Sequence, residues 1–308
     1  MGSTAAGKTA LGIELSRRFN GEVISADSRA IYRGLNIGTA KPTTAEMGGV
    51  PHWGIDLVDP NDSFTAADFQ KYAQQKIREI RQRGHLPIMV GGSGLYVDAV
   101  IFNYDFYRPT NDTQKYQIRE QLANKSIMEL QQIIIEHKIS MPKNFKNARY
   151  LIRAIERFYV NNDVVSTSNN RYKIQPNIII VGISFDKIIV RQRIRQRIGE
   201  MFKNPNLADE TRNAFDQYAA NFAQKVEQRS WSKTDFAALP EALKSNLYLY
   251  KLREMNGELT CSEAERLAAI KDWHLAKRQM TWFRRNKAIT WLLSDQIPDF
   301  LQQQLSIK

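Results

Sequence analysis

Residues 2–9 read Gly-Ser-Thr-Ala-Ala-Gly-Lys-Thr and fit the pattern G-x-x-x-x-G-K-[ST] at every fixed position. In such a loop the glycines let consecutive backbone N–H groups point at phosphate oxygens, and the following helix adds its positive end. Leu11, Leu15 and Phe19 recur four residues apart after the loop, which predicts that helix. The stretch therefore predicts a diphosphate- or nucleotide-binding site formed by Gly2, Ser3, Thr4, Ala5, Ala6, Gly7, Lys8 and Thr9.

Two side chains of this loop have distinct predicted roles. Lys8 is expected to reach the terminal phosphates, and the Thr9 hydroxyl to ligate Mg²⁺, the one cofactor that the sequence predicts.

A loop of this kind normally follows a buried strand, yet only Met1 precedes Gly2. We therefore expect either that the first strand of the sheet is missing from this sequence because its start is misplaced, or that the loop lacks its usual anchor.

The segments that follow alternate between strand-like and helix-like patterns. Short apolar runs from Glu22 to Ala26 and from Leu86 to Val90 predict buried strands, and Thr65 to Arg83 has helical spacing between them. The run from Asn177 to Ser184 predicts a strand that returns to the sheet, and Ala288 to Leu293 a last strand. This alternation predicts an α/β fold: a P-loop NTPase-like parallel sheet flanked by helices.

The character of the chain changes in its middle. From residue 111 to residue 173, Gln, Asn, Lys and Arg dominate and the apolar spacing becomes helical, as at Ile118 and Leu122. We therefore expect two domains: a phosphate-loop α/β core made of residues 1–110 together with 174–308, and a helical insertion over residues 111–173.

The charge balance indicates a polyanionic partner. Among 308 residues, 44 Lys and Arg face 32 Asp and Glu, which leaves a net charge of +12. Such a surplus favours a polyanionic partner, which can be nucleic acid, anionic lipid or a phosphorylated ligand, with nucleic acid as the leading interpretation. The single cysteine, Cys261, excludes an intramolecular disulfide and fits the cytoplasm. No apolar run is long enough to cross a bilayer, so we expect no membrane association through a transmembrane helix.

Two short polar turns follow the predicted strands. Asp27 comes directly after the run that ends at Ala26, and ligands of open α/β sheets bind at the carboxyl ends of strands. A carboxylate there can accept a proton from an attacking amine, or simply cap the next turn. Ser93 lies in the Gly-rich turn after Val90. Its hydroxyl can donate a hydrogen bond to a phosphate or accept one from a base; alternatively, the turn binds no ligand.

Two later stretches are strongly basic. Arg193 and Arg197 lie four apart in the stretch 191–197, where they can clamp a diphosphate or grip an RNA backbone. The stretch 277–285 mixes cations with Trp282 and Phe283, a composition typical of surfaces that bind single-stranded nucleic acid. The alternative for both stretches is a solvated helix face above core aromatics.

Seven segments in this order resemble the tRNA dimethylallyltransferase (tRNA isopentenyltransferase) family. They are GSTAAGKT (2–9), SADSRAIYRGLNIGTAKPT (25–43), VPHWGIDLVDP (50–60), SFTAADF (63–69), GGSGLY (91–96), RQRIRQRIGEMF (191–202) and AKRQMTWFRR (276–285). The resemblance implies transfer of a dimethylallyl group from dimethylallyl diphosphate to the N6 amine of the adenosine 3′ of the tRNA anticodon, with release of pyrophosphate. It also implies that the target base is extruded from its stack.

The resemblance assigns roles residue by residue. The loop 2–9 and Arg197 would hold the diphosphate, Asp27 would be the general base, and Ser93 keeps the hydroxyl of the family's Thr as a second catalytic group. Residues predicted to contact tRNA, by the resemblance or by their place in a basic stretch, are Asp27, Ser28, Arg29, Ala30, Arg149, Arg153, Lys277 and Arg278.

The expected partner is the tRNA anticodon stem-loop, gripped by the helical insertion, and the expected state is a monomer. Three alternatives stay open: a prenyltransferase acting on free adenylate, a P-loop kinase or ATPase, and a catalytically weakened RNA-binding protein. The basic insertion argues against free adenylate, and the sequence shows no convincing second carboxylate motif for a kinase.

Overall fold

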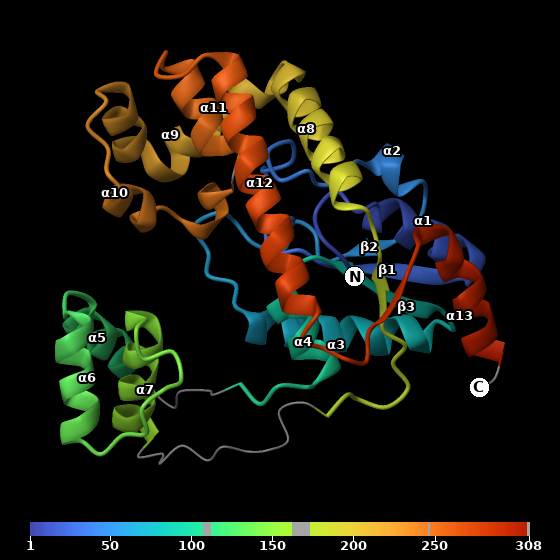
Figure 1. Cartoon of the computed structure of the whole chain (residues 1–308), viewed down its shortest axis with the longest axis horizontal. Helices are drawn as coiled ribbons and strands as arrows, with labels where there is room; N and C mark the ends of the chain where they lie inside the picture. The colour runs from blue at the N-terminus through green and yellow to red at the C-terminus, as the bar shows by residue number, and fades with distance from the viewer. Residues whose placement is uncertain (107–111, 162–172, 246, 307–308) are drawn as a thin grey trace. The chain divides into compact units, whose positions relative to one another are not determined.

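A computed structural model describes residues 1–106, 112–161, 173–245 and 247–306 (Figure 1). The chain divides into two compact units. The larger unit contains Met1–Asn103 and Ile174–Lys308, and the smaller one contains Tyr104–Lys173. We describe each unit by itself.

The larger unit is built on three parallel strands in the order β2-β1-β3. β1 (Gly21–Ala26) lies between β2 (His52–Trp53) and β3 (Leu86–Gly91), and its side chains Val23 and Ile24 are buried. A parallel sheet needs crossover connections, which is why helices separate the strands in sequence. The predicted α/β fold and both of its predicted early strands are confirmed.

The first helices start at well-defined caps. α1 (Lys8–Arg18) begins directly after Gly7, and α3 (Ala66–Gln82) begins with a capping box between Thr65 and Asp68. α4 (Gly94–Ile101) follows β3 and packs against α3, where Phe69 stacks on Tyr96 at 4.3 Å. α1 therefore carries the end of the phosphate loop, and α4 carries the end of the Gly-rich turn.

The next strands form a separate parallel pair. β4 (Val181–Ile183) pairs with β5 (Thr290–Leu292), so the predicted last strand is confirmed in shortened form. The prediction for Asn177 to Ser184 is wrong in two respects. The strand covers only three residues, and among the described residues it does not pair with the β2-β1-β3 sheet. A strand extends only where a partner provides backbone groups, and β5 is equally short.

Helices from the C-terminal half complete this unit. α8 (Lys187–Lys203) and α12 (Cys261–Phe283), which contain the basic stretch 191–197 and most of 277–285, pack side by side through Ile194, Ile198 and Ala268 (Figure 1). No helix within the described ranges is both long and apolar enough to span a membrane. The remaining elements are α2 (Thr44–Met47), α9 (Asn206–Glu227), α10 (Lys233–Ala238), α11 (Tyr248–Met255), α13 (Ile297–Ser306) and the 3₁₀ turns Glu241–Lys244 and Ser294–Gln296.

The smaller unit contains three helices in its described part: α5 (Asp112–Ala123), α6 (Ile127–Glu136) and α7 (Ala148–Asn161). An ion pair from Arg119 to the buried carboxylate of Glu156 links α5 to α7 at 2.8 Å. The unit has its own apolar core, made of Leu122, Leu130, Ile134, Leu151 and Ile155.

Candidate active site

The loop 2–9 curls around its own lysine. Ala5 and Gly7 both have positive φ, at 58° and 84°, a conformation that turns the backbone sharply. The Lys8 Nζ donates to the Ser3 carbonyl at 2.5 Å. Burial lowers the pKa of Lys8 to about 8; Asp27 opposes this shift and Arg197 adds to it. The loop therefore holds a lysine whose ammonium a bound anion would stabilise.

Arg197 of α8 reaches the same loop. Its Nη2 donates to the Thr4 hydroxyl and to Asp272 Oδ2, both at 2.7 Å. Its Nε–H is buried and has no hydrogen-bond partner among the described residues. Arg197 is thus held at the loop with one donor still available to a ligand.

α12 holds the loop from the other side. The Gln279 carboxamide oxygen accepts the Thr4 backbone N–H at 2.7 Å, and Asp272 fixes Arg197. The sequence analysis did not identify Asp272 or Gln279 as site residues. Their seven-residue spacing, two turns along one helix face, was the only signal.

Asp27 and Ser93 follow β1 and β3 at neighbouring strand ends. Asp27 Oδ1 accepts the Arg29 N–H at 2.8 Å, so the capping role is present. The charge of Asp27 also acts on the pKa of Lys8, which places the carboxylate close to the phosphate loop. The Ser93 hydroxyl accepts the Ser28 N–H at 2.9 Å and donates to the Ser28 hydroxyl at 3.1 Å. These bonds join the two turns that carry the candidate catalytic groups.

The glycines of the second turn make room for α12. A Cβ at Gly94 would lie 2.3 Å from the Trp282 ring, and one at Gly92 would lie 2.5 Å from the Gln279 amide nitrogen. The Trp282 indole N–H donates to Asp98 Oδ2 at 2.7 Å. Phe283 is fully buried, so the predicted nucleic-acid surface of α12 is wrong for this ring, whereas Trp282 is half-buried between Asp98 and Arg285.

The predicted tRNA contacts occupy different environments. Arg29 donates to the Glu241 carbonyl, and Ala30 is buried and offers no side chain to solvent. Lys277 and Arg278 are exposed on α12. Arg149 and Arg153 are exposed on α7 of the smaller unit.

The residues that the structure describes contain no cluster of three or more His, Cys, Asp or Glu able to hold a metal ion. A protein-only metal cage is therefore not formed by that part of the chain. Thr9 is exposed at the first turn of α1, where its hydroxyl can ligate a magnesium ion that a diphosphate also holds.

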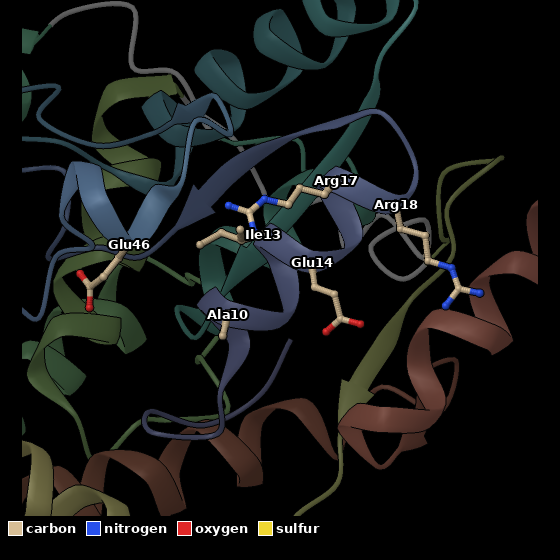
Figure 2. A pocket seen from close by; sticks show the side chains of 6 residues that line it. All are labelled: Ala10, Ile13, Glu14, Arg17, Arg18 and Glu46. Carbon is tan, nitrogen blue, oxygen red and sulfur yellow. The ribbon is translucent and has the colours of Figure 1, made fainter.

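A hollow of about 540 Å³ lies on the outer side of α1, beside α2, and contains none of the predicted site residues (Figure 2). Figure 2 shows Arg17 and Arg18 leaving the end of α1 in different directions. Arg17 donates to the Gly48 carbonyl at 2.9 Å, and Arg18 pairs with Asp299 at 2.8 Å. Both cations are thus engaged within the protein.

Comparison with known proteins gives a consistent set of relatives. A family model described as IPP transferase matches residues 30–286, beginning just after Asp27. A tRNA dimethylallyltransferase of Bacillus subtilis is 32% identical over 296 residues, covering 94% of this chain and 88% of the relative. One from Pediococcus pentosaceus is 36% identical over 295 residues, with the same shares.

Solved structures agree with these relatives. The crystal structure of the tRNA isopentenylpyrophosphate transferase of Bacillus halodurans matches with a TM-score of 0.68 and 30% identity, covering 99% of this chain and 95% of that one. A eukaryotic dimethylallyltransferase acting on tRNA shares the fold, with a TM-score of 0.71 and 22% identity, covering 95% of this chain and 72% of that one. The family model and the sequence relatives each span most of this chain, so it belongs to the IPP transferase family.

Proposed function

We propose that the protein transfers a dimethylallyl group from dimethylallyl diphosphate to the N6 amine of the adenosine 3′ of a tRNA anticodon and releases pyrophosphate. One observation carries this proposal. Four groups lie near the carboxyl ends of β1 and β3: the phosphate loop, Lys8 with its lowered pKa, the buried Nε–H of Arg197, and the Asp27 carboxylate. Prenyl transfer to an amine needs stabilisation of the departing pyrophosphate and removal of a proton from the amine. This set of residues can supply both.

The diphosphate half of the site stabilises the leaving group. When the allylic C–O bond breaks, its electron pair remains on the pyrophosphate, whose negative charge rises. The Lys8 ammonium and the Arg197 Nε–H are donors already at the loop for that charge. Because α8 and α12 hold them before the ligand arrives, little reorganisation is needed.

The acceptor half of the site removes a proton. The N6 nitrogen forms a bond to the allylic carbon and becomes positively charged until it loses a proton. Asp27, next in sequence to β1 and close enough to influence Lys8, accepts that proton. Ser93, hydrogen-bonded to the backbone N–H and the hydroxyl of Ser28, orients the turn that carries the carboxylate.

The Thr9 hydroxyl would hold a magnesium ion together with oxygens of the diphosphate. Mg²⁺ prefers oxygen ligands and usually keeps several waters, so one protein hydroxyl plus phosphate oxygens is an adequate set. Bound there, the ion supplies partial neutralisation of the diphosphate charge.

The tRNA contacts are proposed to come from exposed cations beside exposed rings. In the smaller unit, Arg149 and Arg153 are accompanied by Phe145 and Tyr150, each 44% exposed. Cations hold the phosphate backbone and aromatic rings stack on unpaired bases, which suits an anticodon loop. We propose that the exposed Lys277 and Arg278 of α12 also contact the tRNA backbone. We propose that the protein acts as a monomer in the cytoplasm.

The test is incorporation of labelled dimethylallyl into unmodified tRNA in the presence of Mg²⁺. We expect modification of the adenosine 3′ of the anticodon, and competition by tRNA but not by AMP. Efficient labelling of AMP would support the free-adenylate alternative instead. Binding of dimethylallyl diphosphate, measured separately by calorimetry, shows whether a loss of turnover arises from the donor half or from the tRNA half of the site.

A further inference from the structure

The segment that follows Asp27 is tied at both ends to a group of helices, α9 to α11, in which α9 and α11 pack against each other (Figure 1). At its start, the Arg29 guanidinium donates to the Glu241 carbonyl and lies 3.8 Å from the Glu241 carboxylate, in the 3₁₀ turn between α10 and α11. At its end, the backbone of residues 36–38 contacts the carboxylate of Glu210 on α9. We call residues 29–38 the acceptor segment, because they continue the turn that carries Asp27.

Glu210 accepts hydrogen bonds from three consecutive backbone N–H groups. Its Oε2 accepts the N–H of Asn36 at 2.9 Å and that of Ile37 at 3.0 Å, and its Oε1 accepts the N–H of Gly38 at 2.9 Å. The Tyr248 hydroxyl donates to the same Oε1 at 2.6 Å. Hydrogen bonds to an ionised acceptor are stronger than those between neutral groups. One side chain therefore fixes three residues of the acceptor segment.

The end of the acceptor segment is held on several sides. Tyr248 of α11 is fully buried, and burial together with the charge of Glu210 raises its pKa well above the usual value, so the hydroxyl keeps its proton and donates. Its ring packs against Gly38, where a Cβ would lie 2.4 Å from the ring. The Ser245 hydroxyl donates to the Gly38 carbonyl at 2.8 Å. Gly38 is thus held through its N–H, its carbonyl and the space that its missing side chain leaves.

The middle of the acceptor segment is buried against the same helices. Ile31 and Leu35 belong to an apolar core that also contains Phe215 of α9 and Leu249 of α11. Close-packed interiors transmit displacements, because the packed groups have little free space to absorb them. A shift at residues 36–38 should therefore reach Arg29, whose N–H donates to Asp27 at 2.8 Å.

We propose that Glu210 is a positioning residue for prenyl transfer: by fixing residues 36–38 it holds the acceptor segment, and through Arg29 it holds the Asp27 carboxylate. Its effect on catalysis rests on the proposed function, whereas its effect on the acceptor segment does not. None of the hydrogen bonds of Glu210 in the described part of the chain reaches the loop 2–9. Donor binding should therefore be independent of Glu210.

The first test measures amide exchange in Glu210→Gln. The control is Glu227→Gln, the same change at an exposed position at the end of α9. Gln keeps the shape of Glu, but its amide nitrogen cannot accept an N–H. In Glu210→Gln alone, we expect the amides of residues 36–38 to exchange at least about tenfold faster, and that of Arg29 at least about threefold faster.

The second test separates transfer from donor binding. In Glu210→Gln the single-turnover transfer rate at saturating donor should fall about 10- to 100-fold, as expected when a reacting group is misplaced. Affinity for dimethylallyl diphosphate, measured by calorimetry, should stay within about twofold, a split that general destabilisation does not produce. An unchanged transfer rate in the folded variant, or a loss of donor affinity as large as the loss of rate, would overturn the proposal.

Tyr248→Phe keeps the measurement possible if Glu210→Gln does not fold. This variant retains the ring against Gly38 and removes one donor from Glu210. The same pattern should appear with a smaller loss of transfer rate, about two- to tenfold for one hydrogen bond. If the wild-type chain does not prenylate tRNA, the proposed function fails, and amide exchange alone decides the positioning role. Faster exchange at residues 36–38 that does not extend to Arg29 would overturn that role.

Discussion

Replacement of Arg197 by Met should damage donor binding and stability through separable causes. Arg197 donates to Thr4 and Asp272 and has a further buried N–H aimed at no protein group in the described structure. Hydrogen bonds from a charged donor contribute about 1.5–3 kcal/mol. At 1.4 kcal/mol per tenfold, affinity for dimethylallyl diphosphate should fall roughly 10- to 100-fold.

The stability loss comes from Asp272, which the substitution leaves without its cation. Breaking a fully buried ion pair costs about 3–5 kcal/mol. The Arg197 side chain is 30% exposed and that of Asp272 11%, so solvent screening reduces our expectation to about 1–2 kcal/mol. For a chain of this size that is a fall of about 2–8 °C in the unfolding midpoint.

The double variant Arg197→Met/Asp272→Asn separates the two effects. Because Asn removes the negative charge that had paired with Arg197 and keeps the shape, the unfolding midpoint should return most of the way while donor affinity stays low. Thermal unfolding and calorimetric titration with dimethylallyl diphosphate and Mg²⁺ measure the two quantities on the same samples. Recovery of affinity together with stability would refute the idea that Arg197 contacts the diphosphate.

Three further predictions concern other parts of the site. Asp27→Asn should lower single-turnover prenyl transfer by about 10²–10⁴-fold, as loss of a general base does, with tRNA affinity nearly unchanged in a filter-binding assay. Donor affinity should fall as pH rises above about 8, the pKa of Lys8, because the free protein then loses the ammonium that the diphosphate binds; titrations from pH 7 to 10 measure this. Arg149→Glu with Arg153→Glu should weaken tRNA binding at least about tenfold at low salt and reduce its salt dependence.

Each of these predictions has a matched control. For Asp27, a Glu substitution keeps a carboxylate and should retain part of the activity, whereas equal loss in both variants would contradict a proton-transfer role. For Lys8, an Arg variant keeps its charge to high pH and should lack the fall in affinity above pH 8. For α7, the control is Lys125→Glu, at an exposed position elsewhere on the same unit. If the α7 arginines contact tRNA directly, this change should leave tRNA binding within about twofold. A loss as large as that of the α7 variant would instead indicate a long-range attraction to the whole basic surface.

The parts of the site that follow from local sequence were predictable. The loop 2–9 is specified by residue types at fixed spacing, and its lysine and positive-φ glycine occupy the positions that the pattern requires. Asp27 was placed near the loop from its position after a strand, because parallel strands bring their carboxyl ends to one edge. The electrostatic effect of Asp27 on Lys8 agrees with that placement.

The parts that depend on distant partners were not predictable. Gln279 contacts Thr4 across 275 positions of sequence, and no local pattern distinguishes it from an ordinary polar residue of a helix. Trp282 lies in a basic stretch, but its half-buried ring packs against Gly94, which has no side chain to displace it. The extent of β4 is likewise set by β5, which lies about a hundred residues later.

The hold of α12 on the phosphate loop has a consequence during synthesis of the chain. Thr4 is translated long before its anchor Gln279 and before Asp272, which fixes Arg197 against the loop. At about 5–20 residues per second, the 275 positions between Thr4 and Gln279 correspond to a delay of roughly 15–55 seconds. For that time the nascent loop lacks its anchors, so premature termination before α12 would yield chains with the diphosphate motif intact but no rigid site.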